Sequence, residues 1–319
     1  MNGAGVHVTG ASGFIGSAVV RNLLAAGKPV TASARRSTEL LTEVLGTRVL
    51  PLDITGDLQA QGAAFDGIDT LVHCATPNDI QSRAEDGGMT LAVTGTFRLI
   101  EEAVRRGITK VIYLSTLQVY GTELQGAVDE NTPVRCESPY GLNHYLGEEV
   151  CHFAARRHGI DAVALRPSNV YGLPSVPTVE RSTLVPMCFV NDALATGAVE
   201  LQSSGRQRRN FISTGEVADV IHTLVNDFPS GFSRVNAISH WHASIAEIAL
   251  MLEEVWQEVR GEKLDIHIRS NTPPYANEFN VTSNVIAPRL TREQSQARMR
   301  DVLRGLIENF QSKREAEDE

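Results

Sequence analysis

Three glycines near the start of the chain have the spacing of a turn that holds phosphate groups. They lie in VHVTGASGFIG (residues 6–16), between a short apolar run and an amphipathic segment. A glycine turn from a strand into a helix brings backbone N–H groups and the positive end of the helix dipole to a pyrophosphate. We therefore expect a dinucleotide site, with an ordinary structural turn as the alternative. The expected cofactor contacts here are Gly10, Ser12, Gly13, Phe14, Ile15 and Gly16.

Two arginines follow the second expected strand. Arg35 and Arg36 come directly after the strand pattern, and no acidic residue appears before Glu39. An acidic residue at such a strand end binds the ribose hydroxyl of NAD, whereas an arginine accommodates the 2′-phosphate of NADP. The pair predicts NADP(H), and two solvated surface arginines are the alternative. Other strand ends add Asp53, Ile54, Cys74, Ala75 and Thr76 to the expected cofactor contacts, although Cys74 also suits simple packing.

Two hydroxyl side chains and a tyrosine lie at positions where they could form part of a ligand site in an α/β protein. Ser115 and Thr116 follow a short apolar run, and ligands bind at the carboxyl ends of parallel strands. Tyr140 and His144 are four residues apart in an expected helix, so they share one helix face. The four side chains are candidates for one site.

The elements that must position these residues alternate through the first half of the chain. Strand and helix patterns follow one another, which predicts a doubly wound parallel sheet of the α/β class. The strands are expected near residues 6–8, 29–34, 49–52, 70–75, 110–114 and 163–165. Prolines then break the alternation. The later pattern predicts helices near 187–195, 215–227, 245–259 and 292–310, a loop over 271–288 and a disordered tail from 312.

The net charge, the cysteines and the apolar runs of the chain exclude several classes of protein. The 319 residues carry a net charge of −9, which argues against a nucleic-acid partner. Four scattered cysteines form no CxxC pair, so the sequence predicts no metal site and fits a reducing compartment. No apolar run is long enough for a membrane span, and no secretory signal is recognised. We expect a cytoplasmic protein without a membrane partner.

Five ordered stretches together resemble the extended short-chain dehydrogenase/reductase superfamily, in its nucleotide-sugar epimerase/dehydratase/reductase branch. They are similar to its phosphate loop, serine/threonine motif, catalytic tyrosine helix and two nucleotide-sugar contacts. In that order they are TGASGFIG (9–16), LSTLQVYG (114–121), SPYGLNHYLGE (138–148), LRPSNVYG (165–172) and GRQRRNF (205–211). The resemblance is continuous to about residue 235 and implies an NAD(P)-dependent enzyme with a Rossmann-type fold.

The resemblance also implies roles for matching residues. Tyr140 would give a proton to a carbonyl oxygen, or take one from a hydroxyl, and Thr116 would hydrogen-bond the same oxygen. Ser115 would sit beside Thr116, and Pro167 would join the cofactor contacts.

The same resemblance implies contacts to a nucleoside-diphosphate sugar. Asn169 would contact the diphosphate, and Arg209 would pair with it, because a guanidinium fork suits phosphate geometry. Arg208 could take the place of Arg209, and a surface arginine in a basic loop is the alternative for either.

Two departures from the family pattern bear on the chemistry. His144 stands where the family has a lysine that holds the nicotinamide ribose and lowers the pKa of the tyrosine. Ala92 stands where the family has an asparagine. Histidine is mostly uncharged near neutral pH. A reductase tolerates this better than an oxidising enzyme, because its tyrosine begins neutral and donates a proton. We therefore expect His144 to replace the lysine as a catalytic and cofactor-binding residue.

The residues after the motif threonine bear on the reaction. Leu117 and Gln118 occupy the positions where the dehydratases carry Asp-Glu, which makes a 4,6-dehydratase a poor fit. We expect an NADPH-dependent ketoreductase that reduces the 4-keto group of a nucleoside-diphosphate 4-keto-6-deoxy sugar. An NAD-dependent 4-epimerase and a non-catalytic NADP(H) sensor are the alternatives.

The pattern also predicts two lobes and a dimer. A cofactor-binding lobe should span residues 1–172, with 213–236 returning to it, and a substrate lobe should span 173–212 and 237–319. Family members commonly dimerise through two helices, which here are expected at 94–106 and 140–158. The apolar residues that could supply this surface, or merely cover the sheet, are Phe97, Ile100, Val150 and Phe153.

Overall fold

The computed structural model describes residues 5–84, 87–176, 179, 183–268 and 278–318. Its largest element is a seven-stranded, wholly parallel sheet in the order β11-β7-β5-β4-β1-β2-β3. The strands in that order are Phe232–Ala237, Asp161–Pro167, Lys110–Leu114, Ile68–His73, Gly5–Thr9, Val30–Ala34 and Val49–Pro51. The predicted doubly wound α/β sheet is thus confirmed.

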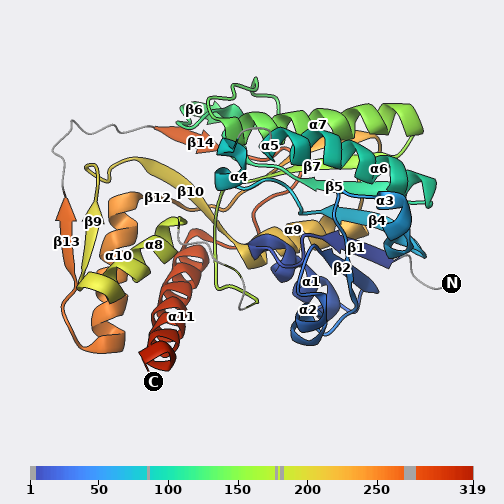
Figure 1. The fold of residues 1–319 in the computed structure, drawn as a ribbon. Coiled ribbons are helices and arrows are strands. Elements are labelled where there is room, and N and C mark those ends of the chain that lie inside the picture. Colours follow the sequence, from blue (N-terminus) through green and yellow to red (C-terminus); the bar gives the residue numbers. More distant parts are fainter. Residues whose placement is uncertain (1–4, 85–86, 177–178, 180–182, 269–277, 319) are drawn as a thin grey trace.

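Helices cover both faces of the sheet (Figure 1). On one face lie α1 (Phe14–Ala25), α2 (Thr38–Leu45) and α9 (Thr214–Asn226). On the other lie α3 (Leu58–Gln61), α6 (Thr96–Arg105) and α7 (Pro139–His158). Neighbouring strand residues point to opposite faces, and for this reason Ile112 joins one apolar core and Val111 the other.

Short elements connect β4 to α6. They are α4 (Asp79–Arg83), α5 (Gly87–Met89) and a π-helical turn, η2 (Thr90–Gly95), in which Ala92 is fully buried. Two 3₁₀ turns, η1 (Gly62–Phe65) and η3 (Leu117–Tyr120), follow α3 and β5. Of these elements, α4, η2 and η3 bring several side chains to the carboxyl edge of the sheet.

The remaining elements form three small sheets with helices beside them. β12 (His242–Ser244), β10 (Arg208–Ser213) and β8 (Asn169–Tyr171) make one sheet. The pairs are β13 (Asp265–Ile268) with β9 (Ala198–Leu201), and β14 (Phe279–Val281) with β6 (Gly126–Val128). The helices are α8 (Val185–Thr196), α10 (Ile245–Arg260) and α11 (Arg292–Asp318).

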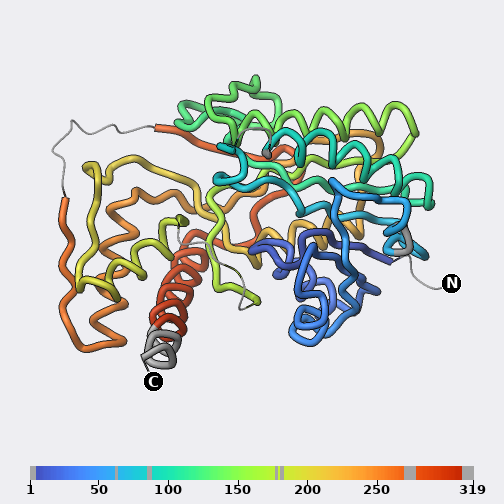
Figure 2. Tube along the Cα trace, in the orientation of Figure 1, coloured from blue at the N-terminus to red at the C-terminus, as the bar shows by residue number. Residues whose placement is uncertain are grey.

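The Cα trace shows how the chain is divided in space (Figure 2). The blue-to-green first half forms most of the large sheet and the helices beside it, while α10, β13 and α11 lie together on the other side of the molecule. The later chain returns to this half, because α9 packs on α1, β11 pairs with β7, and β14 pairs with β6. The division into two lobes at the stated boundaries stays a prediction.

Two expectations for the C-terminal third are wrong. The loop expected over 271–288 contains β14, which pairs in parallel with β6; residues 271–277 lie outside the described ranges. The tail expected to be disordered continues α11 through Asp318. A three-residue strand paired over such a distance carries no periodic signal of its own.

Candidate functional site

The glycine turn between β1 and α1 has no room for side chains. Gly10 adopts φ +71°, and a Cβ there would lie 2.8 Å from the backbone of Cys74. A Cβ on Gly16 would overlap the Gly10 carbonyl oxygen. Gly13 caps α1 without a side-chain hydrogen bond, which leaves the helix N-terminus open to an anion. This cradle fits the pyrophosphate of a dinucleotide.

A cavity of about 230 Å³ lies on one side of this turn. Among the predicted cofactor residues, its lining includes Gly10, Ser12, Gly13, Arg35, Ile54, Cys74, Ala75 and Thr76. Arg36 and Asp53 are not among its lining residues. Arg36 is exposed, and hydrogen bonds from Thr55 lower the pKa of the Asp53 carboxyl. One of the two predicted arginines therefore faces the cavity.

A second cavity, of about 480 Å³, lies on the other side of the turn. The predicted residues that line it are Gly13, Phe14, Ile15, Gly16, Cys74, Thr76, Ser115, Thr116, Tyr140, His144, Pro167, Asn169 and Arg209. Gly13, Cys74 and Thr76 line both cavities, so the two form one groove along the carboxyl edge of the sheet. Burial raises the pKa of the Cys74 thiol to about 12, which keeps it protonated at neutral pH.

Thr116 and Tyr140 enter the larger cavity from different elements. Thr116 caps η3, and its hydroxyl oxygen accepts a hydrogen bond from the Gln118 backbone N–H at 3.2 Å. The hydroxyl proton thus stays available to an acceptor in the cavity. Tyr140 lies in the first turn of α7, which the Ser138 side chain caps by accepting from the Gly141 N–H. The sequence prediction that these side chains share one cavity is consistent with this geometry.

His144 lies one helical turn beyond Tyr140, and the two rings meet edge to face at 4.5 Å. Only 2% of the residue is exposed, and its Nε2 donates a hydrogen bond to the Pro77 carbonyl oxygen at 3.1 Å. Burial lowers the pKa of His144 to about 4, although the nearby Pro77 and Leu114 carbonyls act to raise it. The imidazole is therefore uncharged near neutral pH.

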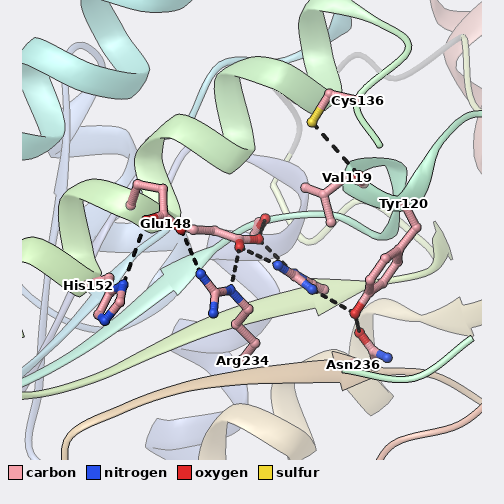
Figure 3. Close-up of polar contacts among 10 residues, drawn as sticks. Val119, Tyr120, Cys136, Glu148, His152, Arg234 and Asn236 are labelled. Carbon is pink, nitrogen blue, oxygen red and sulfur yellow. Dashed lines mark hydrogen bonds and ion pairs between the residues drawn. The ribbon is translucent and has the colours of Figure 1, made fainter. Parts of the chain in front are cut away.

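A buried charge network adjoins the larger cavity at Ser115, and Figure 3 shows its members Glu148, Tyr120, Arg234 and Asn236. Glu148 of α7 and Arg166 of β7 are both fully buried and joined by two hydrogen bonds of 2.8 and 2.6 Å. Ser115 donates to the same Glu148 carboxylate at 2.5 Å. The predicted contact of Ser115 with the cofactor stays a prediction, and the Ser115 hydroxyl already donates its hydrogen bond to Glu148. The network joins the helix of Tyr140 to the strand that precedes Thr116.

The network extends to β11. Arg166 donates to the Tyr120 hydroxyl at 2.6 Å, and that hydroxyl donates to Asn236 at 3.0 Å. Arg234 donates to Glu148 and to Glu149, which is partly exposed (Figure 3). Sequence reasoning did not single out this network. The available signal was Arg166, a charged residue that directly follows the apolar run at 162–165.

A third cavity, of about 480 Å³, continues from the second through shared lining residues. Asn169 and Arg209 line both, whereas Arg208 lines the third cavity alone. Arg209 donates to Asn169 Oδ1 at 3.2 Å, and burial lowers the pKa of its guanidinium. Arg208 donates to the His242 carbonyl at 2.7 Å and lies 3.5 Å from the Glu247 carboxylate. The two arginines thus have different partners, and the Arg209 guanidinium places a positive charge where the second and third cavities meet.

Gln118 and Thr122 were not predicted as site residues, yet they line both of these cavities. They flank Tyr120 in the serine/threonine motif region, and this position was the available signal. Within the described ranges, no group of three or more His, Cys, Asp or Glu side chains could hold a metal ion. No helix in the described part of the chain has the length and apolar character needed to span a membrane.

The sequence match and the fold agree on the family. The chain belongs to the NAD dependent epimerase/dehydratase family, which it matches over residues 6–237. This confirms the resemblance to the extended short-chain dehydrogenases/reductases. The family comprises NAD(P)-dependent enzymes that modify nucleotide sugars.

Individual relatives are named for different reactions. A putative UDP-glucose 4-epimerase of Methanocaldococcus jannaschii is 29% identical over 224 residues, which are 67% of this chain and 70% of that protein. A dTDP-4-dehydro-6-deoxy-D-allose reductase of a Streptomyces species is 28% identical over 300 residues, 89% of this chain and 91% of that protein.

Among solved structures, the fold is similar to UDP-glucuronic acid 4-epimerase from Bacillus cereus in complex with UDP-glucuronic acid and NAD. The TM-score is 0.74 at 23% identity, over 94% of this chain and 99% of that one. The structural likeness thus shows the fold, the match over residues 6–237 shows the family, and the relatives' names include both reductases and epimerases.

Proposed function

We propose that this chain is an NADPH-dependent ketoreductase that reduces the 4-keto group of a nucleoside-diphosphate 4-keto-6-deoxy sugar. The observation that carries the proposal is the uncharged His144 packed against Tyr140. A fixed cation would lower the pKa of the phenol and favour tyrosinate. A neutral neighbour leaves the phenol protonated, and a reductase needs a protonated phenol as its proton donor.

The joined cavities suggest how the cofactor would lie. The glycine turn would hold the pyrophosphate, Arg35 would bind the 2′-phosphate, and Ile54 would border the adenine. The nicotinamide, when bound, supplies hydride to the keto carbon. Tyr140 donates its phenolic proton to the keto oxygen as negative charge develops there. Thr116 donates a hydrogen bond to the same oxygen and orients it.

The third cavity would hold the nucleotide of the substrate. Arg209 would pair with the diphosphate where the second and third cavities meet, and Asn169 would present its remaining amide N–H. A partly buried guanidinium whose neighbour is a neutral amide forms stronger, charge-assisted hydrogen bonds with an anionic ligand. The relatives from Methanocaldococcus and Streptomyces, by their names, act on nucleotide sugars, which supports this substrate class.

The direct test follows NADPH absorbance after purified protein is mixed with a nucleoside-diphosphate 4-keto-6-deoxy sugar. We expect NADPH oxidation with equimolar formation of the reduced sugar nucleotide, and a slower reaction with NADH. Absence of NADPH loss with dTDP- and UDP-linked substrates would contradict the proposal.

A 4-epimerase is the second candidate, because epimerases occur among the relatives and similar structures. Denaturing freshly purified protein distinguishes the two. Released NAD together with interconversion of UDP-glucose and UDP-galactose supports an epimerase, whereas an exchangeable NADP(H) supports the reductase.

Arg35→Ala is expected to raise KM for NADPH about tenfold and to change KM for NADH by less than about twofold. The reason is loss of a charge-assisted hydrogen bond, worth about 1.5–3 kcal/mol before solvent screening, to a group that NADH lacks. Arg36→Ala is the matched control, because Arg36 does not line the cavity. Equal effects on both cofactors would contradict the assignment of Arg35.

Arg209→Ala is expected to raise KM for the sugar nucleotide about tenfold or more, with little change in KM for NADPH. Arg208→Ala is the comparison variant and should have the smaller effect, since Arg208 lines the third cavity alone and its guanidinium is held by His242 and Glu247. Initial-rate kinetics with each substrate varied in turn would measure both. A larger effect at Arg208 would reverse the assignment.

We also propose that α6 and α7 form a homodimer surface. Phe97 and Phe153 are 38% and 48% exposed, with ring centroids 6.3 Å apart. Ile100, in contrast, is buried against the sheet and Val150 partly so, which favours the covering role for these two.

Phe153→Asp is expected to convert a dimer into a monomer, measured by light scattering after size-exclusion chromatography. A buried carboxylate at an apolar interface is costly. Leu250→Asp, at a similarly exposed position on α10, should leave the mass unchanged. A monomeric wild-type protein would contradict the proposal.

A further inference from the structure

The wall between the two cofactor cavities is a segment without regular structure. Residues 74–78 connect β4 to α4 and include Cys74, Thr76 and Asn78, which line both cavities. Because no helix or sheet ladder holds this segment, its position depends on individual hydrogen bonds.

Hydrogen bonds attach the segment to its surroundings at three of its residues, Ala75, Pro77 and Asn78. The Ala75 N–H donates to the Thr9 hydroxyl at 3.3 Å, and Asn78 caps α4 by accepting from the Gln81 N–H at 2.7 Å. Between them, the Pro77 carbonyl accepts from His144 at 3.1 Å. Of these bonds, the one to Pro77 alone joins the wall to α7, the helix that carries Tyr140.

The imidazole is held in a fixed orientation. It lies between the rings of Tyr140, at 4.5 Å, and Tyr113, at 6.2 Å, and is almost completely buried. Because the Pro77 carbonyl oxygen can only accept, its bond to Nε2 assigns the proton of the neutral ring to Nε2; the Leu114 carbonyl also lies near the ring. The Nε2–H group already donates to the Pro77 carbonyl oxygen, so it does not donate to a hydroxyl of the cofactor.

We propose that His144 is a positioning residue that fixes the Cys74–Asn78 wall against α7 and strengthens NADP(H) binding through that wall. The cofactor named here rests on the proposed function, but the coupling of wall and helix does not. In this proposal the His144 side chain links α7 to the wall by a hydrogen bond, whereas the lysine at this position in the family contacts the ribose directly.

Two amide substitutions separate this role from a direct contact. In His144→Gln the side-chain NH₂ can reach the place of Nε2, whereas in His144→Asn it ends near Nδ1 and falls short of Pro77. We expect His144→Asn to raise the dissociation constant for NADP⁺ about five- to tenfold, the effect of one buried hydrogen bond. His144→Gln should stay within about twofold of wild type.

Hydrogen exchange in nucleotide-free protein gives a readout independent of activity. Peptides covering 74–79 should exchange faster in His144→Asn and near wild-type rates in His144→Gln. His152→Asn makes the same change two turns further along α7, next to Phe232, and should alter neither measurement.

Equal impairment in the Gln and Asn variants, or unchanged exchange at 74–79 in both, would overturn the proposal. If neither variant folds, ¹⁵N spectra of the wild-type histidines decide: an Nε2–H tautomer for His144 supports the proposal, and an Nδ1–H tautomer overturns it. A failed ketoreductase assay leaves these outcomes unaffected, so the two proposals fail separately.

Discussion

Tyr140→Phe should lower kcat by about 10²–10⁴-fold while leaving the dissociation constant for NADP⁺ within about threefold of wild type. The change removes the proposed proton donor but keeps the ring that packs on His144. Without that donor, the keto oxygen must take its proton from water. Single-turnover NADPH oxidation and equilibrium titration with NADP⁺ would measure the two quantities.

Tyr145→Phe is the control for this prediction. Tyr145 lies on the same helix, is partly buried and packs in a different apolar cluster, with Leu117 and Val119. Its substitution should change kcat by less than about twofold. If Tyr140→Phe kept more than a tenth of wild-type activity, another group would have to be the proton donor. A protein that only sensed NADP(H) would lose no function in either variant.

Glu148→Gln should destabilise the fold by about 3–5 kcal/mol, because it leaves Arg166 buried without a counter-charge. The substitution keeps the shape of the side chain, so the loss reports the charge and not packing. Urea denaturation followed by tryptophan fluorescence would measure it. Replacing both members of the pair, in Glu148→Leu/Arg166→Met, should recover much of the lost stability.

Glu149→Gln is the matched control. Glu149 is adjacent in sequence and pairs with Arg234 at 2.6 Å, but both side chains remain partly exposed. A solvated ion pair contributes about 0–1 kcal/mol, so the variant should lose no more than that. Equal losses at Glu148 and Glu149 would mean that burial of the first pair has no energetic consequence.

Much of the fold was predictable because it depends on local pattern. Alternating apolar strands and amphipathic helices indicated the parallel sheet, and the glycines at 10, 13 and 16 indicated its phosphate-binding turn. The turns between residues 79 and 95 were not predicted, since short helices and a π-turn follow no fixed period. The pairing of β14 with β6 was missed for the same reason.

The candidate site was predictable as a set of residues but not as a set of contacts. Thr116, Tyr140 and His144 line one cavity, as the motifs suggested. The partner of His144 is a backbone carbonyl at Pro77, and a carbonyl is present at every residue, so the sequence carries no sign of it. The cofactor contact expected of Ser115 stays a prediction, and nothing in the sequence indicated that its hydroxyl donates a hydrogen bond to Glu148, in a later motif.

The place of β7 in the sheet has a consequence for synthesis of the chain. One edge of β7 pairs with β5, but its other edge pairs with β11, which is made much later. Until the ribosome has released Phe232–Ala237, a nascent chain presents an unpaired apolar strand, and such edges invite misassembly. Translational arrest after residues 161–167 have left the ribosome, but before residues 232–237 have done so, should therefore yield a chaperone-dependent, aggregation-prone intermediate.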